Sequence, residues 1–194
     1  MPLTYRLNHV SLYYRKAGDS VKYKEIYDEY NALLQTRHDC LNALSTLKEG
    51  YISTKTISGN KYFYLQKKVD GKLGSEYIKE DMLPQVRYEL QKRTEFEQTI
   101  IQTEKRLDQL ETAANLLDDA LCRKLIILRR CAAMDSMPAQ VRRKSLEFGG
   151  AMTALEGIPA SEDTETALSL WAMGQSSFAD GYLQTLAKYR LIEV

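Results

Sequence analysis

Between Pro84 and Pro138 the chain contains neither glycine nor proline, and this interval constrains the fold more than any other feature of the sequence. Apolar residues recur in it near the first and fourth positions of a heptad, with Ala114 keeping the spacing. They are Ile100, Leu107, Leu110, Leu117, Leu121 and Leu128. Because no helix breaker interrupts them, the pattern predicts one long amphipathic helix from about 81 to 134.

The preceding residues predict a second helix followed by strands. From about 19 to 48 apolar side chains keep helical spacing, and Gly50 ends that helix. Residues 51–78 are rich in β-branched and aromatic side chains, interrupted by turn sequences at Ser58-Gly59-Asn60 and Asp70-Gly71. They predict a three-stranded meander with strands at about 51–57, 61–69 and 72–78.

These elements together indicate a mostly α-helical fold. We expect a long antiparallel coiled-coil helical hairpin that carries a small three-stranded antiparallel β-sheet at its tip, with self-association of the coiled coil left open. Carboxylates along the second helix are expected to be solvated flanks of that coiled coil.

A break in the helical pattern at Asp135-Ser136-Met137-Pro138 predicts a boundary near residue 135, with Asp135 or Ser136 capping a new helix. The remaining residues indicate a small three-helix C-terminal domain. Its helices are expected at about 138–156, 162–173 and 176–190. The predicted domains are therefore 1–134, the hairpin with its meander at 51–78, and 135–194.

Composition and motifs argue against several classes of protein. Lysine plus arginine number 27 against 26 aspartate plus glutamate, so a wholly basic nucleic-acid-binding protein is not expected. No apolar segment is long enough for a membrane helix, so we expect a cytoplasmic protein that does not bind membranes. The common nucleotide, hydrolase and metalloprotease motifs are missing, so an enzyme is not expected.

Cysteine and histidine positions do not predict a metal site or a cofactor. Cys40, Cys122 and Cys131 form no CxxC pair and lie in helical patterns, so they are expected to be reduced, partly buried thiols. The two histidines, His9 and His38, are far from any cysteine cluster.

A lone carboxylate, Glu156, stands before Gly157 where a helix is expected to end. A negative charge is unfavourable near the C-terminal end of a helix dipole, so stability of the fold does not explain it. The simplest alternative is that Glu156 merely precedes a glycine that ends the helix.

The last quarter of the chain resembles the VbhA-like antitoxin family, whose members inhibit Fic-domain toxins. The similarity lies in AMTALEG and, after a short loop with proline, ASEDTETALSLWAMGQSSFADGYLQTLAKY. Fic proteins transfer AMP from ATP to a target hydroxyl. The family's inhibitory helix carries Ser or Thr, three residues, Glu, and then Gly or Asn, and the Glu engages an arginine that would otherwise bind the γ-phosphate.

The resemblance implies a role for residues around Glu156. Glu156 would be the inhibitory carboxylate and Gly157 the motif glycine, but Met152 stands where the family has Ser or Thr, with Thr153 beside it. The residues expected to contact the partner are Phe148, Ala151, Leu155 and Trp171. Because neither histidine lies in a Fic motif, the chain would act in trans on a separate Fic-domain toxin.

A second interpretation places the function in the meander. YFYLQKKVDGKLGSEYI resembles the three-stranded N-terminal modules of phage integrases and transposon proteins, which bind DNA. Lysines would contact phosphate, and Tyr62 and Tyr64 would share one face of a strand unless they pack on the helices. The lysines are Lys55, Lys61, Lys67, Lys68 and Lys72. The meander could equally bind protein, and a coiled-coil scaffold without either activity is the third alternative.

Overall fold

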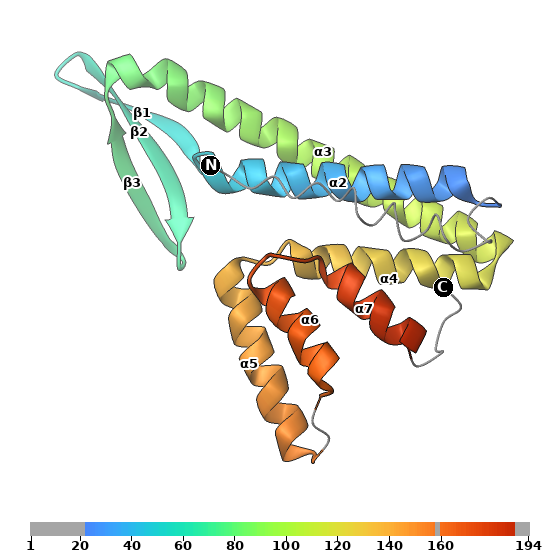
Figure 1. Ribbon diagram of the computed structural model, residues 1–194. Helices are drawn as coiled ribbons and strands as arrows, with labels where there is room; N and C mark the ends of the chain where they lie inside the picture. The colour runs from blue at the N-terminus through green and yellow to red at the C-terminus, as the bar shows by residue number, and fades with distance from the viewer. Residues whose placement is uncertain (1–21, 158–159, 189–194) are drawn as a thin grey trace. The chain divides into compact units, whose positions relative to one another are not determined.

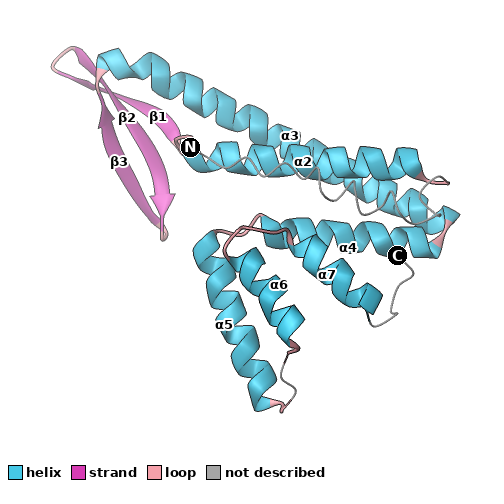
Figure 2. Cartoon of the chain, in the orientation of Figure 1, coloured by secondary structure: helices cyan, strands magenta, loops and turns pink. Residues whose placement is uncertain are grey.

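The computed structural model describes residues 22–157 and 160–188 of the chain, so His9, residues 19–21 of the first predicted helix and residues 189–190 of the last lie outside it. The described elements are α2 (Lys24–Thr46), β1 (Tyr51–Ile57), β2 (Asn60–Val69), β3 (Lys72–Ile78), the 3-10 helix η4 (Glu80–Met82), α3 (Leu83–Leu117), α4 (Asp119–Asp135), α5 (Ala139–Leu155), α6 (Glu162–Ala172) and α7 (Phe178–Lys188). Figure 1 labels them, and Figure 2 distinguishes helices from strands. Over these residues, no helix is both long and apolar enough to span a membrane.

The described residues divide into two compact units, each with its own apolar core. One unit contains the residues up to Gln35 together with those from Arg106 onward, and the other contains Thr36–Lys105. The division therefore runs through α2 and α3. That residues 1–134 and 135–194 each fold on their own remains a prediction.

The second predicted helix is in fact two helices. α3 ends at Leu117, and α4 begins after Asp118, whose backbone is extended. The Asp118 carboxylate accepts hydrogen bonds from the backbone N–H groups of Ala120, at 2.9 Å, and Leu121, at 3.4 Å. These bonds lower the pKa of Asp118, because they favour its charged form. Asp118 is therefore an N-cap, and the chain reverses there without glycine or proline.

The reversal shows that the predicted fold class is wrong. Helix α4 folds back, so that Leu121, Leu125 and Leu128 share one core with Leu107 and Leu110 of α3. Tyr27, Tyr30 and Leu34 of α2 complete that core, and Ala179 of α7 joins it. The sheet follows the first of the six described α-helices and precedes the other five. It is therefore not the tip of a two-helix hairpin followed by three further helices.

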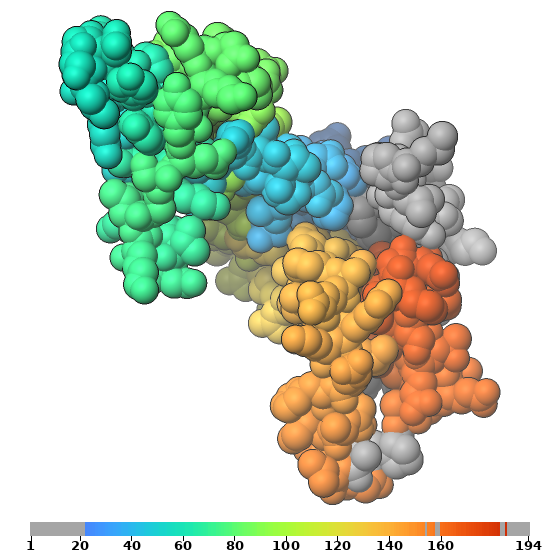
Figure 3. Space-filling model, turned by 90° about the vertical axis from the view of Figure 1, so that its left-hand side faces the viewer, coloured from blue at the N-terminus to red at the C-terminus, as the bar shows by residue number. Residues whose placement is uncertain are grey.

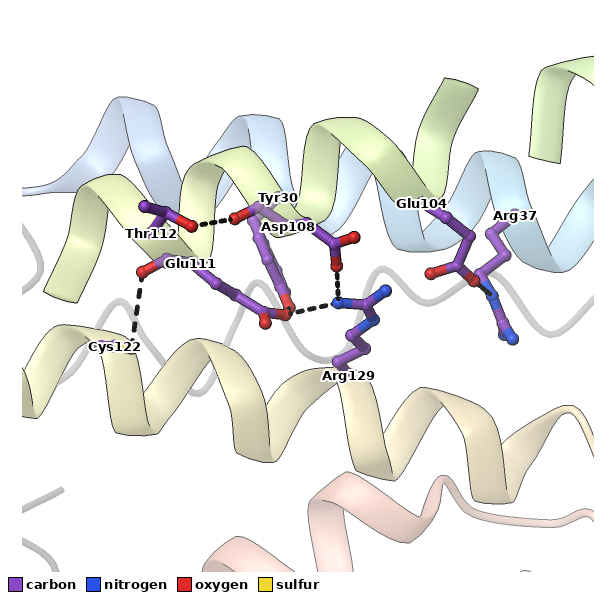
Figure 4. Close-up of polar contacts among 8 residues, drawn as sticks. All are labelled: Tyr30, Arg37, Glu104, Asp108, Glu111, Thr112, Cys122 and Arg129. Atoms are coloured by element: carbon purple, nitrogen blue, oxygen red, sulfur yellow. Dashed lines mark hydrogen bonds and ion pairs between the residues drawn. The ribbon is translucent and has the colours of Figure 1, made fainter. Parts of the chain in front are cut away.

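A partly buried polar network joins α2, α3 and α4 in this core (Figure 4). The hydroxyl of the fully buried Tyr30 donates to the Glu111 carboxylate at 2.5 Å. Arg129 donates to the same carboxylate at 3.0 Å and to Asp108 at 2.6 Å. Because Arg129 and Asp108 lie on opposite sides of the Asp118 reversal, these bonds fix the pairing of α3 with α4. Glu111 is therefore not a solvated flank of a coiled coil, whereas the Asp108 side chain stays mostly exposed.

The cysteines agree with the prediction: Cys40, Cys122 and Cys131 are free and buried. Burial raises the pKa of each thiol, and that of Cys131 to about 12. A thiol with so high a pKa is uncharged at neutral pH and does not act as a nucleophile.

The C-terminal helices pack beside α4. α7 contacts α4 and α6, and α5 contacts α6 (Figure 1). Asp135, the last residue of α4, accepts a hydrogen bond from the backbone N–H of Phe178 at 2.7 Å. Asp135 thus caps the first turn of α7. The sequence predicts instead that it caps α5, the next helix in the chain after Asp135. Burial raises its pKa to about 6, against the opposing effect of the Phe178 hydrogen bond.

The raised pKa of Asp135 predicts how stability depends on pH. Below about pH 4 the Asp135 carboxyl is protonated in both the folded and the unfolded state. Between about pH 4 and pH 6 it ionises in the unfolded state but resists ionisation in the folded state, so the free energy of unfolding falls as the pH rises. Asp135→Asn should therefore raise the free energy of unfolding at neutral pH by about 3 kcal/mol, with little gain near pH 4. Urea unfolding at both pH values measures this, and Asp81→Asn at an exposed site is the control. An equal effect at both pH values would contradict it.

Candidate functional site

The carboxylate of Glu156 lies at the exposed end of α5. The Glu156 backbone N–H donates to the Met152 carbonyl at 3.1 Å, and Gly157 then takes a φ of 70°, the left-handed conformation that ends helices. Among the described residues, the Glu156 side chain has no hydrogen-bond or ion-pair partner. Glu156 therefore lies at a helix end, as predicted, with its charge directed to solvent.

One side of α5 carries an apolar stripe, which consists of Val141, Phe148, Met152 and Leu155. Their exposed fractions are 44%, 69%, 41% and 83%. At about 100° per residue these positions fall within roughly 60° of one another, and Glu156 borders them. In Figure 3 α5 is the orange segment at the surface of its unit. The stripe is thus an apolar surface that ends beside an unpaired carboxylate.

The residues that depart from the family motif supply no hydroxyl to Glu156. Met152 has none, and the Thr153 hydroxyl donates to the Gly150 carbonyl of its own helix at 3.1 Å. Ala151 is exposed. Gly149 and Gly150 are also exposed, and a Cβ added to either would meet nothing within 4 Å. Packing within the described chain therefore does not explain two glycines in a helix, where each costs about 0.5–1 kcal/mol.

Trp171 does not lie on this surface. It is only 3% exposed, its ring meets that of Phe178 edge to face at 5.1 Å, and the Arg142 guanidinium lies 5.9 Å from its centre. The predicted contact of Trp171 with a partner stays a prediction, and in this structure the tryptophan is buried where α5, α6 and α7 meet. Of the predicted contact residues, Phe148, Ala151 and Leu155 are accessible.

The second candidate site is the sheet of the other unit. β2 pairs antiparallel with β1 and β3 in the order β1-β2-β3, and the strands agree with the predicted meander. The inner face, with Leu65 and Ile78, packs on Leu83 and Val86 at the start of α3. Gly50 leads into β1 with a φ of 123°, and a Cβ there would lie 2.2 Å from the Gln66 carbonyl oxygen, so only glycine fits.

The opposite side of the sheet is called the outer face. The register and the alternation of strand side chains assign to it Tyr51, Ser53, Lys55 and Ile57 of β1, Asn60, Tyr62, Tyr64, Gln66 and Lys68 of β2, and Leu73, Ser75 and Tyr77 of β3. The sequence predicts that Tyr62 and Tyr64 share one face of their strand, and the register agrees. The sequence does not identify Tyr51 or Tyr77 as members of the same face, because only the pairing between strands places them on it.

The predicted phosphate-binding lysines do not share one face. Lys55 and Lys68 are on the outer face, whereas Lys61, Lys67 and Lys72 alternate to the other side. The five lysines therefore cannot all contact one ligand on a single face, and their predicted contact with phosphate stays a prediction. A single strand with consecutive lysines, as at Lys67-Lys68, necessarily divides them between its faces.

The outer face carries a cluster of tyrosines. Tyr77 lies 5.7 Å from the Tyr64 ring centre and 6.3 Å from that of Tyr62, and the Lys55 ammonium lies 4.9 Å from the centre of Tyr64. Tyr51 and Tyr77 remain 55% and 53% exposed. The arrangement presents aromatic rings and a cation to solvent.

A hollow of about 490 Å³ adjoins the sheet where β1 begins. Its lining includes Tyr51 and Lys68, but also Glu49 and Glu97. The Glu97 carboxylate pairs with Arg93 at 2.9 Å. The hollow is therefore mixed in charge, in contrast to the part of the outer face around Tyr77.

Comparison with known proteins gives one match. Residues 27–88 match the model of a family described as a domain of unknown function, DUF6788. The matched segment contains most of α2, the whole sheet and the first turns of α3. Neither the curated proteins nor the solved structures provide a match to this chain.

Proposed function

We propose that this chain is an antitoxin-like inhibitor that binds a Fic-domain toxin in trans through α5 and blocks productive ATP binding with Glu156. The observation that carries the proposal is the exposed apolar stripe of α5, which ends beside a carboxylate that has no partner among the described residues. The resemblance of residues around Glu156-Gly157 to VbhA-like antitoxins names the partner. The chain acts as a binding protein and not as a catalyst, and it works in the cytoplasm, where ATP is available to a Fic-domain partner.

The stripe and the carboxylate contribute differently. Burial of Phe148 and Leu155, the most exposed members of the stripe, supplies affinity. The Glu156 carboxylate would accept two hydrogen bonds from a guanidinium, and exclusion of water by the surrounding apolar contacts strengthens that pair. An arginine occupied in this way is not available to a phosphate of ATP.

One glycine of α5, Gly149, lies beside Glu156 and supports a close approach by a partner there. Gly149 and Gly150 leave open space beside the helix backbone, and nothing in the described chain fills it. A partner that packs against the bare backbone would offset the cost of placing glycine inside a helix. Gly149→Ala should then stabilise the free chain slightly while weakening the complex, whereas Gly150→Ala should stabilise the free chain without weakening the complex, because Gly150 lies on the side of α5 opposite the stripe.

The proposal is tested by co-expressing the full chain with a Fic-domain protein from the same genome and measuring retention of that protein in a pull-down. The double variant Phe148→Ser and Leu155→Ser should weaken binding at least about tenfold, because both side chains lose apolar burial. Leu116→Ser is the matched control, since Leu116 is as exposed as Leu155, at 83% each, but lies at the end of α3. Failure of the unmodified chain to retain any such protein, or equal losses in both variants, would contradict the proposal.

A further inference from the structure

The strand residues of the outer face form an aromatic surface without a carboxylate, and Glu49 and Glu97 adjoin it only at the hollow beside Tyr51 and Lys68. Tyr77 and Tyr51 expose more than half of their surface, and Tyr64 lies between them on β2, with Tyr62 beyond it. An isolated exposed tyrosine needs no explanation, but Tyr62, Tyr64 and Tyr77 form one cluster of rings on this face, with Tyr51 further along on β1. β1 and β3 flank β2, and Tyr51 pairs with Gln66 whereas Tyr77 pairs with Tyr64, so their Cα atoms stand roughly 12 Å apart by the usual spacings between strands and along them.

The charges of the outer face all have one sign. Lys55 and Lys68 are its only charged residues, and no carboxylate occurs among the described strand residues of that face. The one acidic side chain in these strands, Glu76, alternates to the other side and pairs with Lys48 at 3.6 Å. The Lys55 ammonium lies over the Tyr64 ring, which keeps a cation beside the aromatic cluster. Such a surface is complementary to a ligand that combines flat rings with negative charge.

We propose that the outer face binds single-stranded nucleic acid, with bases stacked on Tyr77 and Tyr51 and with Lys55 and Lys68 contacting the phosphate backbone. Exposed aromatic rings beside cations are the usual means of holding single strands, because unpaired bases offer their faces for stacking. In a duplex those faces are covered by neighbouring base pairs.

Recognition of a duplex would depend on hydrogen-bonding side chains of this face, such as Asn60 and Gln66, and not on its tyrosines. Reading of base edges in a groove depends mainly on arginine, lysine, asparagine and glutamine, which reach into the groove with hydrogen-bonding groups. The centre of the outer face is instead filled by Tyr62, Tyr64 and Tyr77, and the described outer-face residues include no arginine. The inference is independent of the Fic-inhibitor proposal, because the sheet and α5 belong to different compact units.

The test measures binding of the full chain to a fluorescein-labelled oligothymidylate of about 15 nucleotides by fluorescence anisotropy. Tyr77→Ala should weaken binding roughly tenfold through loss of one stacking ring. Tyr88→Ala should leave it unchanged, and it is a matched control because Tyr88 is 57% exposed on α3 and also lies near a lysine, with the Lys92 ammonium 5.9 Å from its ring centre. Tyr77→Phe keeps a ring and should retain binding.

Lysine variants and a duplex competitor complete the experiment. Lys55→Ala should reduce the slope of log affinity against log salt by about 0.7, and Lys61→Ala, an exposed lysine on the opposite side of the sheet, should change it less. A duplex of the same length should compete at least about ten times less well than the single strand. Absence of binding by the unmodified chain, equal competition by the duplex, or equal losses for Tyr77→Ala and Tyr88→Ala would overturn the inference.

Discussion

Glu156→Ala should release AMP transfer by the bound Fic-domain protein while leaving the complex assembled. Under the proposed function, inhibition depends on one carboxylate that competes with phosphate for an arginine, whereas binding depends on the apolar stripe of α5. Loss of a desolvated charge pair costs about 2–5 kcal/mol, so AMP transfer should rise on the order of 100-fold. The measurement is auto-AMPylation of the purified complex with labelled ATP.

A second glutamate on the same helix provides the control. Glu147 is exposed on α5, and helical spacing places it on the opposite side from Glu156, so Glu147→Ala should leave the complex silent. Met152→Ser restores the hydroxyl of the family motif and should keep or strengthen inhibition. Equal silence of the Glu156→Ala and unmodified complexes would mean that Glu156 is only the end of a helix.

The sheet could be predicted from sequence because its signals are local. Alternating apolar residues and two turn sequences locate the strands to within one residue at each end, β2 beginning at Asn60 instead of 61. The same alternation separates Tyr62 and Tyr64 from Phe63 and Leu65. Local alternation does not show which residues of other strands join a face, so the tyrosine cluster with Tyr77 required the register of the folded sheet.

The reversal at Asp118 was not predicted because its signal is weak and the heptad continues through it. An N-cap is marked by a single polar residue, which is common in any sequence. Leu110, Leu117 and Leu121 meanwhile keep coiled-coil spacing on both sides of Asp118. In an antiparallel pair of helices each helix needs an apolar stripe of its own. A continuous stripe is therefore compatible with one long helix or with two that fold together.

The candidate site on α5 could be predicted only in part. A carboxylate before a helix-ending glycine is visible in sequence, and so is the apolar character of Phe148 and Leu155. The exposure of Phe148 and Leu155 cannot be predicted from sequence, because the same helical spacing is typical of residues in a core. The sequence places Trp171 both in the core of the C-terminal helices and among the partner contacts, and only its burial in the core is observed. The sequence pattern does not identify Val141, which lies on the stripe.

Leu125→Ala should lower the free energy of unfolding more than Leu117→Ala does in the observed fold. The predicted coiled coil would give the reverse order. Leu117 occupies the predicted seam, but it is 60% exposed at the end of α3. Leu125 falls outside that seam, yet it is fully buried against α2 and α3. Leu125→Ala should therefore lower the free energy of unfolding by about 3 kcal/mol, because it removes buried methyl groups and leaves a cavity. Leu117→Ala should cost less than about 1 kcal/mol. Urea unfolding of the full chain measures both, and a larger loss for Leu117→Ala would argue for a continuous helix through Asp118.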